Sequence, residues 1–171
     1  VSWNVAAWKK TVENIWEHHK SSLGKGTSSS VGSGPAAKAA VLVEYLTSMG
    51  VDILCLQEVK IDKLKLNDCA MMIGARSGEF DVFFGLPAGG DSSGRGGVGN
   101  GKSTSRQQSG GLNGVATYVR KGLTCGACST ALDDGGELDK EGRCILTDHG
   151  SFVVFNVYVP NGQGGQRMIV K

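Results

Sequence analysis

Apolar residues along the chain fall into short runs whose spacing changes between that of strands and that of helices. The first run, VSWNV at 1–5, is short, β-branched and aromatic, which is typical of a strand. Residues 8–20 then place apolar side chains at helical spacing, with charged residues between them. A second helix is predicted over 36–49, because Pro35 favours a helix start and Gly50 a helix end.

The later apolar runs are predicted to form strands. VDILCLQ at 51–57 is almost continuously apolar, as in a strand that is buried on both faces. Further strands are predicted at 80–86, 112–122, 141–150 and 151–162. Asp148-His149-Gly150 has the composition of a hairpin turn between the last two. Strands and helices do not alternate strictly, so the pattern predicts an α/β layered domain rather than a repeated βαβ winding.

The composition fits a single domain. A chain of 171 residues can bury a sizeable core, and its apolar runs are far shorter than the about 20 residues of a membrane helix. Segments 21–35 and 87–111 are rich in Gly and Ser, so we expect flexible insertions there. Five scattered cysteines, an odd number, favour a reducing intracellular compartment. The chain opens at Val1 inside a predicted strand, and we expect it to be the N-terminal part of a longer protein.

The overall charge does not identify a partner. The chain has 18 basic and 16 acidic residues, which gives a formal net charge of +2. This value is too small to indicate nucleic-acid binding. It does not exclude such binding either, because a local basic patch matters more than the total.

Two short motifs suggest chemistry that their surroundings do not support. GGVGNGKS at 96–103 satisfies the P-loop pattern with Lys102, but a P-loop needs a buried strand before it and a helix after it. Gly- and Ser-rich segments flank the motif here, so nucleotide binding is disfavoured. CGAC at 125–128 has the spacing of half a zinc site. No second pair follows it, so two ordinary thiols in a loop are favoured.

The three histidines have structural explanations. His18 and His19 lie near a predicted helix C-terminus, where a positive charge interacts favourably with the helix dipole. His149 falls in the predicted turn, where we expect it to be exposed. We therefore favour no catalytic role for any of them.

Polar side chains mark the ends of predicted strands. Alternation places Glu58 on one strand face with Leu54 and Leu56, where a partly buried carboxylate requires a cation as its partner. A salt bridge to Lys or Arg and a metal ion are the two alternatives. Asn4 is a poor choice for a strand core, although a local hydrogen bond at a strand edge explains it as well as a functional role does.

The last predicted strand repeats this arrangement. Alternation places Asn156 and Tyr158 on one face, and the other face carries Val153, Phe155, Val157 and Val159. Asn161 follows directly after the strand. Ligands bind at the carboxyl ends of strands in α/β sheets, and a hard cation prefers carboxylate oxygens, amide oxygens and water. The strand ends therefore indicate a site for a hard metal ion.

These segments together resemble the class II abasic-site (AP) endonuclease branch of the endonuclease/exonuclease/phosphatase family. The similarity is carried by SWNV, DILCLQEVK, NGVATYVRK, EGRCILTDHGSFVVFNVYVPN and QRMIVK, in the order of the family. EGRCILTDHG and QRMIVK are most similar to the AP endonuclease 2 subgroup. The resemblance implies a DNase I-like, four-layered α/β sandwich of two packed mixed sheets flanked by helices, with its N-terminal half in residues 1–171.

The resemblance also implies an activity. The expected reaction is hydrolysis of the DNA backbone on the 5′ side of an abasic site in base excision repair, with Mg²⁺ as cofactor and Mn²⁺ as a substitute. The same chemistry implies 3′–5′ exonuclease and 3′-phosphodiesterase activity on blocked 3′ ends. A monomeric nuclear protein without a membrane partner is expected, with an organelle as the alternative location.

Site residues follow from the same resemblance. Glu58 and Asn4 are assigned to the metal site. Tyr158 is assigned to contact with the scissile phosphate, and Asn161 to the orientation of that phosphate, which makes both catalytic candidates. Arg143 and Asn113 are assigned to DNA contact. For Arg143, a structural ion pair is the alternative.

The sequence also departs from the family pattern. Ala6 stands where the family usually has Asn or Asp, which weakens the expected metal site, and Leu112 replaces a common DNA-contacting Tyr. The family's later Asp-x-Asn and Ser-Asp-His motifs are not in this sequence, so we expect the chain alone to be inactive. A catalytically impaired DNA-binding module and another metal-dependent phosphodiesterase of the superfamily are the alternatives.

Overall fold

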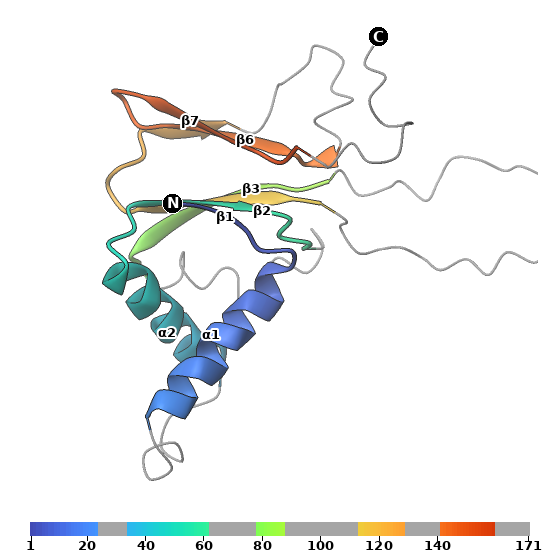
Figure 1. Cartoon of the computed structure of the whole chain (residues 1–171). Helices are drawn as coiled ribbons and strands as arrows, with labels where there is room; N and C mark the ends of the chain where they lie inside the picture. Colours follow the sequence, from blue (N-terminus) through green and yellow to red (C-terminus); the bar gives the residue numbers. More distant parts are fainter. Residues whose placement is uncertain (24–33, 62–77, 88–112, 129–140, 160–171) are drawn as a thin grey trace, which may run out of the picture.

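The computed structural model describes residues 1–23, 34–61, 78–87, 113–128 and 141–159 (Figure 1). Its helices and strands follow the predicted order of strand, helix, helix and then strands. They are β1 (Ser2–Asn4), α1 (Trp8–Ser22), α2 (Pro35–Ser48), β2 (Ile53–Gln57), β3 (Phe80–Gly85), β4 (Val115–Arg120), β5 (Gly126–Cys128), β6 (Cys144–Asp148) and β7 (Val153–Val157).

Seven strands form two sheets among the described residues. Sheet A has the order β1-β2-β4-β3 and is mixed, because β1 pairs with β2 in parallel and the other pairs are antiparallel. Sheet B has the order β5-β6-β7 and is antiparallel. Figure 1 shows the sheets stacked, with α1 and α2 on the far side of sheet A. The predicted α/β class is confirmed, and the described residues form three layers. Sheet A is mixed as predicted, whereas the described strands of sheet B are all antiparallel.

The main apolar core lies between the helices and sheet A. α1 buries Trp8, Val12 and Trp16, which are four residues apart and therefore share one face of the helix. Each fully buried large apolar side chain stabilises the fold by about 1.5–3 kcal/mol. The indole of Trp8 also donates a hydrogen bond to the hydroxyl of Tyr118, at 2.9 Å. The other fully buried large residues of this core include Leu42, Leu46, Leu54, Leu56 and Phe80.

A polar side chain, Asn156 of β7, joins the two sheets. It is 2% exposed, and its Nδ2 lies 2.8 Å from the carbonyl oxygen of Ala116 and 3.2 Å from that of Leu56. Its Oδ1 accepts a 2.7 Å hydrogen bond from the side chain of Gln57. The amide of Asn156 thus holds β7 against both β2 and β4, in a region where an unpaired polar group would destabilise the fold.

Glycine allows a close approach of the sheets where β3 and β6 meet. A Cβ atom at Gly85 would collide with the carbonyl oxygen of Cys144, and one at Gly142 with the backbone of Leu86. Gly142 also has a φ of 62°, which glycine adopts readily. Since Arg143 follows Gly142 directly, this contact helps to fix the position of Arg143 between the sheets.

Two predictions near the second sheet were wrong. CGAC was expected in a loop, but Gly126–Cys128 forms β5, which pairs with β6. His149 was expected to be exposed, yet it is half-buried and stacked on Phe152. Its Nδ1 donates to the carbonyl of Leu123 at 3.0 Å, and its Nε2 lies 2.9 Å from the hydroxyl of Thr147. The predicted hairpin between β6 and β7 is confirmed.

The predicted Gly/Ser-rich insertions fall largely outside the described residues. The first was placed too widely, because α1 extends to Ser22 and α2 begins at Pro35. Residues 24–33 and 88–112, which include the P-loop pattern, are not described. Within the described part of the chain, no helix is long and apolar enough to cross a membrane.

Replacing Asn156 tests the polar link between the sheets. We expect Asn156→Ala to lower the free energy of unfolding by about 2–3 kcal/mol, because it leaves buried acceptors unpaired and opens a small cavity. Urea denaturation measures this change. Phe155→Ala is the matched control, since its side chain is 59% exposed, and it should cost less than about 1 kcal/mol. Equal losses in the two variants would contradict the role given to Asn156.

Candidate functional site

Three predicted site residues meet at one edge of the stacked sheets. Asn4 ends β1, and Glu58 follows β2 directly. Because β1 and β2 are parallel, with Asn4 opposite Gln57, their carboxyl ends lie together. Tyr158 follows β7, and its backbone N–H donates to the carbonyl of Arg143 at 2.7 Å. The strand ends of both sheets therefore contribute to the same place.

The backbone at Glu58 turns the carboxylate toward this edge. Leu54 and Leu56 point into the helix-side core, and strict alternation would send Glu58 the same way. Glu58 instead has a φ of 55°, in the left-handed region, which ends the alternation. Val59, which is 1% exposed, anchors the turn, and its N–H donates to the carbonyl of Gly114 at 3.0 Å.

Two side chains hold the carboxylate of Glu58. Asn4 donates its Nδ2–H to Oε1 at 2.9 Å, and the ammonium of Lys60 lies 3.2 Å from Oε2. The hydroxyl of Tyr158 lies near enough to influence the pKa of the carboxylate. The hydrogen bond from Asn4 lowers the pKa of Glu58 most, partial burial opposes it, and Lys60 and Tyr158 lower it further. Glu58 is therefore ionised at neutral pH, which suits a ligand for a cation better than a general base.

Asn4 has its amide orientation fixed at both ends. Its Oδ1 accepts the backbone N–H of Ala6 at 3.2 Å, while its Nδ2 faces the carboxylate of Glu58. The reverse orientation would place oxygen against oxygen and N–H against N–H. In this arrangement Asn4 positions Glu58, and its own oxygen has one hydrogen bond and one remaining lone pair.

Ala6 occupies a position that favours other residue types. Its φ is 54°, a left-handed conformation that Asn, Asp and Gly adopt more readily than Ala. Ala6 is also exposed and lies two residues from Asn4. The backbone there would accept the Asn or Asp that the family pattern has, whereas Ala6 offers no polar side chain.

Tyr158 and Arg143 form the sheet B side of the site. Burial and the neighbouring Glu58 raise the pKa of the Tyr158 phenol, and Arg143 opposes that increase. The phenol therefore keeps its proton at neutral pH and can donate a hydrogen bond. Arg143 forms an ion pair with Glu141 through Nη2, while its buried Nε has no hydrogen-bond partner in the structure. The predicted structural ion pair thus exists, and it leaves one guanidinium donor unused.

The remaining predicted residues lie in different places. Asn113 is half-buried, and its carbonyl accepts the N–H of Lys60 at 3.1 Å. Asn161 lies outside the described residues. Lys60 was not singled out from the sequence, although its position two residues after Glu58 in LQEVK was a usable signal.

The donor set fits part of a site for a hard divalent cation. Glu58 supplies one ionised carboxylate, and Mg²⁺ commonly binds with one or two protein carboxylates while keeping several waters. Among the residues described, no group of three or more His, Cys, Asp or Glu side chains could hold a metal ion. Glu58 could supply one charged ligand to such an ion, and Asn4 orients its carboxylate.

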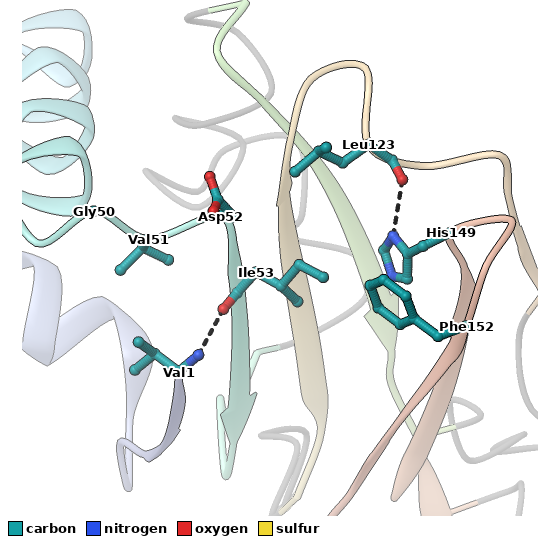
Figure 2. Close-up of a pocket in the computed structure, with 8 residues that line it drawn as sticks. All are labelled: Val1, Gly50, Val51, Asp52, Ile53, Leu123, His149 and Phe152. Carbon is teal, nitrogen blue, oxygen red and sulfur yellow. Dashed lines mark hydrogen bonds between the residues drawn. The ribbon is translucent and has the colours of Figure 1, made fainter.

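A separate cavity has a volume of about 530 Å³, and Figure 2 shows residues that line it. It lies at the start of β2, near Asp52 and Ile53, whereas Glu58 follows the end of that strand. The stacked His149 and Phe152 form its sheet B wall. None of the predicted site residues lines it, so the cavity is distinct from the site at Glu58.

Comparison with known proteins gives a family and similar solved structures. A family model described as "Endonuclease/Exonuclease/phosphatase family" matches residues 1–169. No curated protein matches the chain. A solved AP endonuclease from Archaeoglobus fulgidus is 24% identical with a TM-score of 0.42, over 72% of this chain and 36% of that protein. A likeness of this degree carries no information about substrate or mechanism.

The lowered pKa of Glu58 predicts a pH dependence of stability. Its ordinary value is 4.5, so its stabilising effect is fully present above that pH. The effect is lost as the pH falls through the lower folded-state pKa. We expect Glu58→Gln to flatten the decline in stability below about pH 4.5, measured by urea denaturation at several pH values. Glu44→Gln, on the exposed side of α2, should keep the wild-type profile, and an unchanged profile for Glu58→Gln would contradict the assignment.

Proposed function

Because the chain belongs to the Endonuclease/Exonuclease/phosphatase family, we propose that it is part of a Mg²⁺-dependent DNA phosphodiesterase that cleaves the backbone 5′ to abasic sites. The observation that supports this proposal is the meeting of Asn4, Glu58 and Tyr158 at one edge of the two sheets. An ionised carboxylate beside a protonated phenol suits a phosphodiester, whose transition state gains negative charge. The chain spans 36% of the matched AP endonuclease, so the activity belongs to the proposal for the whole protein.

Each residue has a defined part in this chemistry. Glu58 would hold the divalent ion, which supplies charge stabilisation at the phosphate when bound. Asn4 orients that carboxylate through its fixed amide. Tyr158 keeps its proton and can donate a hydrogen bond to a phosphate oxygen. We further propose that Arg143 contacts DNA phosphate from the sheet B side, and that Asn113 does so from the neighbouring loop.

The proposal extends to the wider expectations of the resemblance. Exonuclease and 3′-phosphodiesterase reactions use the same phosphodiester chemistry at a strand end. Asn161 is proposed to orient the scissile phosphate beside Tyr158. A monomeric protein that acts in base excision repair in the nucleus, or in an organelle, fits this activity. On the same basis, we propose that the whole protein belongs with the AP endonuclease 2 subgroup and has its four-layered fold. We also propose that Mn²⁺ can replace Mg²⁺.

A second candidate function rests on Ala6. A left-handed position that favours Asn or Asp is occupied by a residue without a polar side chain. A protein with a weakened metal site would bind DNA without cutting it efficiently. Measured cleavage by the full-length protein distinguishes an enzyme from such a binding module.

Substitution of Glu58 tests the proposed activity. In the full-length protein, we expect Glu58→Gln to lower Mg²⁺-dependent nicking of an abasic duplex by at least about a hundredfold, because the ion loses its charged ligand. Nicking is measured on a labelled oligonucleotide with one abasic site. Glu44→Gln serves as the control with the same change in charge. Full nicking by Glu58→Gln would overturn the metal role of Glu58.

Restoring a polar group at position 6 tests the second candidate. We expect Ala6→Asp to tighten Mn²⁺ binding by about fivefold, because it adds a carboxylate close to Glu58. Ala6→Asn is the neutral comparison, and it should stabilise the fold by about 0.5 kcal/mol because Asn adopts the left-handed conformation more readily than Ala. Isothermal titration calorimetry measures the binding. Unchanged or weaker Mn²⁺ binding by Ala6→Asp would show that position 6 does not face the metal site.

A further inference from the structure

Lys60 is built into the site and has no role in the function proposed so far. Its ammonium lies 3.2 Å from Oε2 of Glu58, and its side chain is 38% exposed. The backbone fixes this placement, because the N–H of Lys60 donates to the carbonyl of Asn113 at 3.1 Å and its φ is 51°. With Val59 buried between them, Glu58 and Lys60 turn their charged groups toward each other. The backbone at the end of β2 therefore fixes the ion pair between Glu58 and Lys60.

This contact changes what the Glu58 carboxylate can bind. Oε1 already accepts the amide N–H of Asn4, and Oε2 faces the ammonium. A divalent cation that binds Oε2 would have to share this oxygen with the ammonium of Lys60. Two positive groups repel each other at such short range, so the ion and the ammonium compete for that oxygen.

We propose, on the basis of the function above, that Lys60 is a positioning residue that exchanges its partner when the metal binds. Without the ion, the ammonium of Lys60 pairs with Oε2 of Glu58 and orients the carboxylate. When a divalent ion occupies Oε2, the ammonium moves away on its flexible four-carbon stem and binds a phosphate oxygen of the DNA.

The chemistry of the surroundings favours a phosphate as the second partner. Lysine ammonium groups bind phosphate as point charges, and they do not need the fixed geometry of arginine. Tyr158 brings a further hydrogen-bond donor to the same edge of the sheets. A phosphodiester placed there would meet the phenol and the released ammonium.

Metal titration of the full-length protein tests the first half of the exchange. We expect Lys60→Met to bind Mn²⁺ about fivefold more tightly than wild type, measured by calorimetry, because the competing charge is gone. Lys60→Arg keeps the charge and should bind as wild type does. Lys20→Met is the matched control for net charge, because Lys20 is exposed and lies near the C-terminal end of α1. This variant should leave the Mn²⁺ affinity unchanged.

The salt dependence of DNA binding tests the second half. Without metal, Lys60→Met should leave the slope of log affinity against log salt unchanged, because Lys60 pairs with Glu58 in that state. With Ca²⁺ present, the slope for an abasic duplex should fall by about one for Lys60→Met, because one phosphate contact is lost. A structural ion pair alone would leave the slope unchanged in both states.

The outcomes separate this inference from the proposed function. If wild type binds Mn²⁺ and Lys60→Met binds it equally well or more weakly, the exchange is wrong and the metal site stands. An unchanged slope with Ca²⁺ overturns the phosphate contact. If neither wild type nor Lys60→Met binds Mn²⁺, both the metal site and the exchange are overturned.

Discussion

The site depends on the hydrogen bonds of one buried amide, that of Asn156. This side chain bonds to the backbone of β2 and β4 and to Gln57, so it fixes how sheet B lies on sheet A. Tyr158 lies two residues further along the chain, and Glu58 lies one residue after Gln57. A shift of one sheet would separate the phenol from the carboxylate. Because a buried amide with unpaired groups costs free energy, the link resists such a shift and holds the site together.

Local backbone conformation at the strand ends also determines how the site residues are placed. Ala6, Glu58 and Lys60 all have φ values between 51° and 55°, and all three follow strand ends at the same edge. Non-glycine residues in the left-handed region are uncommon and concentrate at functional sites, where the surrounding structure enforces them. Here the parallel pairing of β1 with β2 and the buried Val59 provide that enforcement. The strained positions aim Glu58 and Lys60 at each other and leave Ala6 beside them.

The sequence predicted the order and type of the elements well, and the site in part. Asn4, Glu58 and Tyr158 were predicted from strand ends and a family resemblance, and they lie together. Lys60 was missed although it lies two residues after Glu58, because their pairing depends on the left-handed backbone at this strand end. β5 was missed because a three-residue strand is shorter than any reliable period. His149 was misplaced because its two hydrogen bonds come from a distant loop and a strand.

The sequence by itself determined which residues of a strand share a face, because side chains alternate with a period of two. It could not decide which face of β7 is covered. The tertiary structure buries Asn156 and leaves Phe155 59% exposed, since the face with the amide is the one that meets sheet A. Likewise, the sequence placed a carboxylate at a strand end, while long-range packing chose its partners. Period is a property of the local chain, whereas burial and pairing depend on segments about 50 to 100 residues apart, as the contacts of Glu58 and Asn156 show.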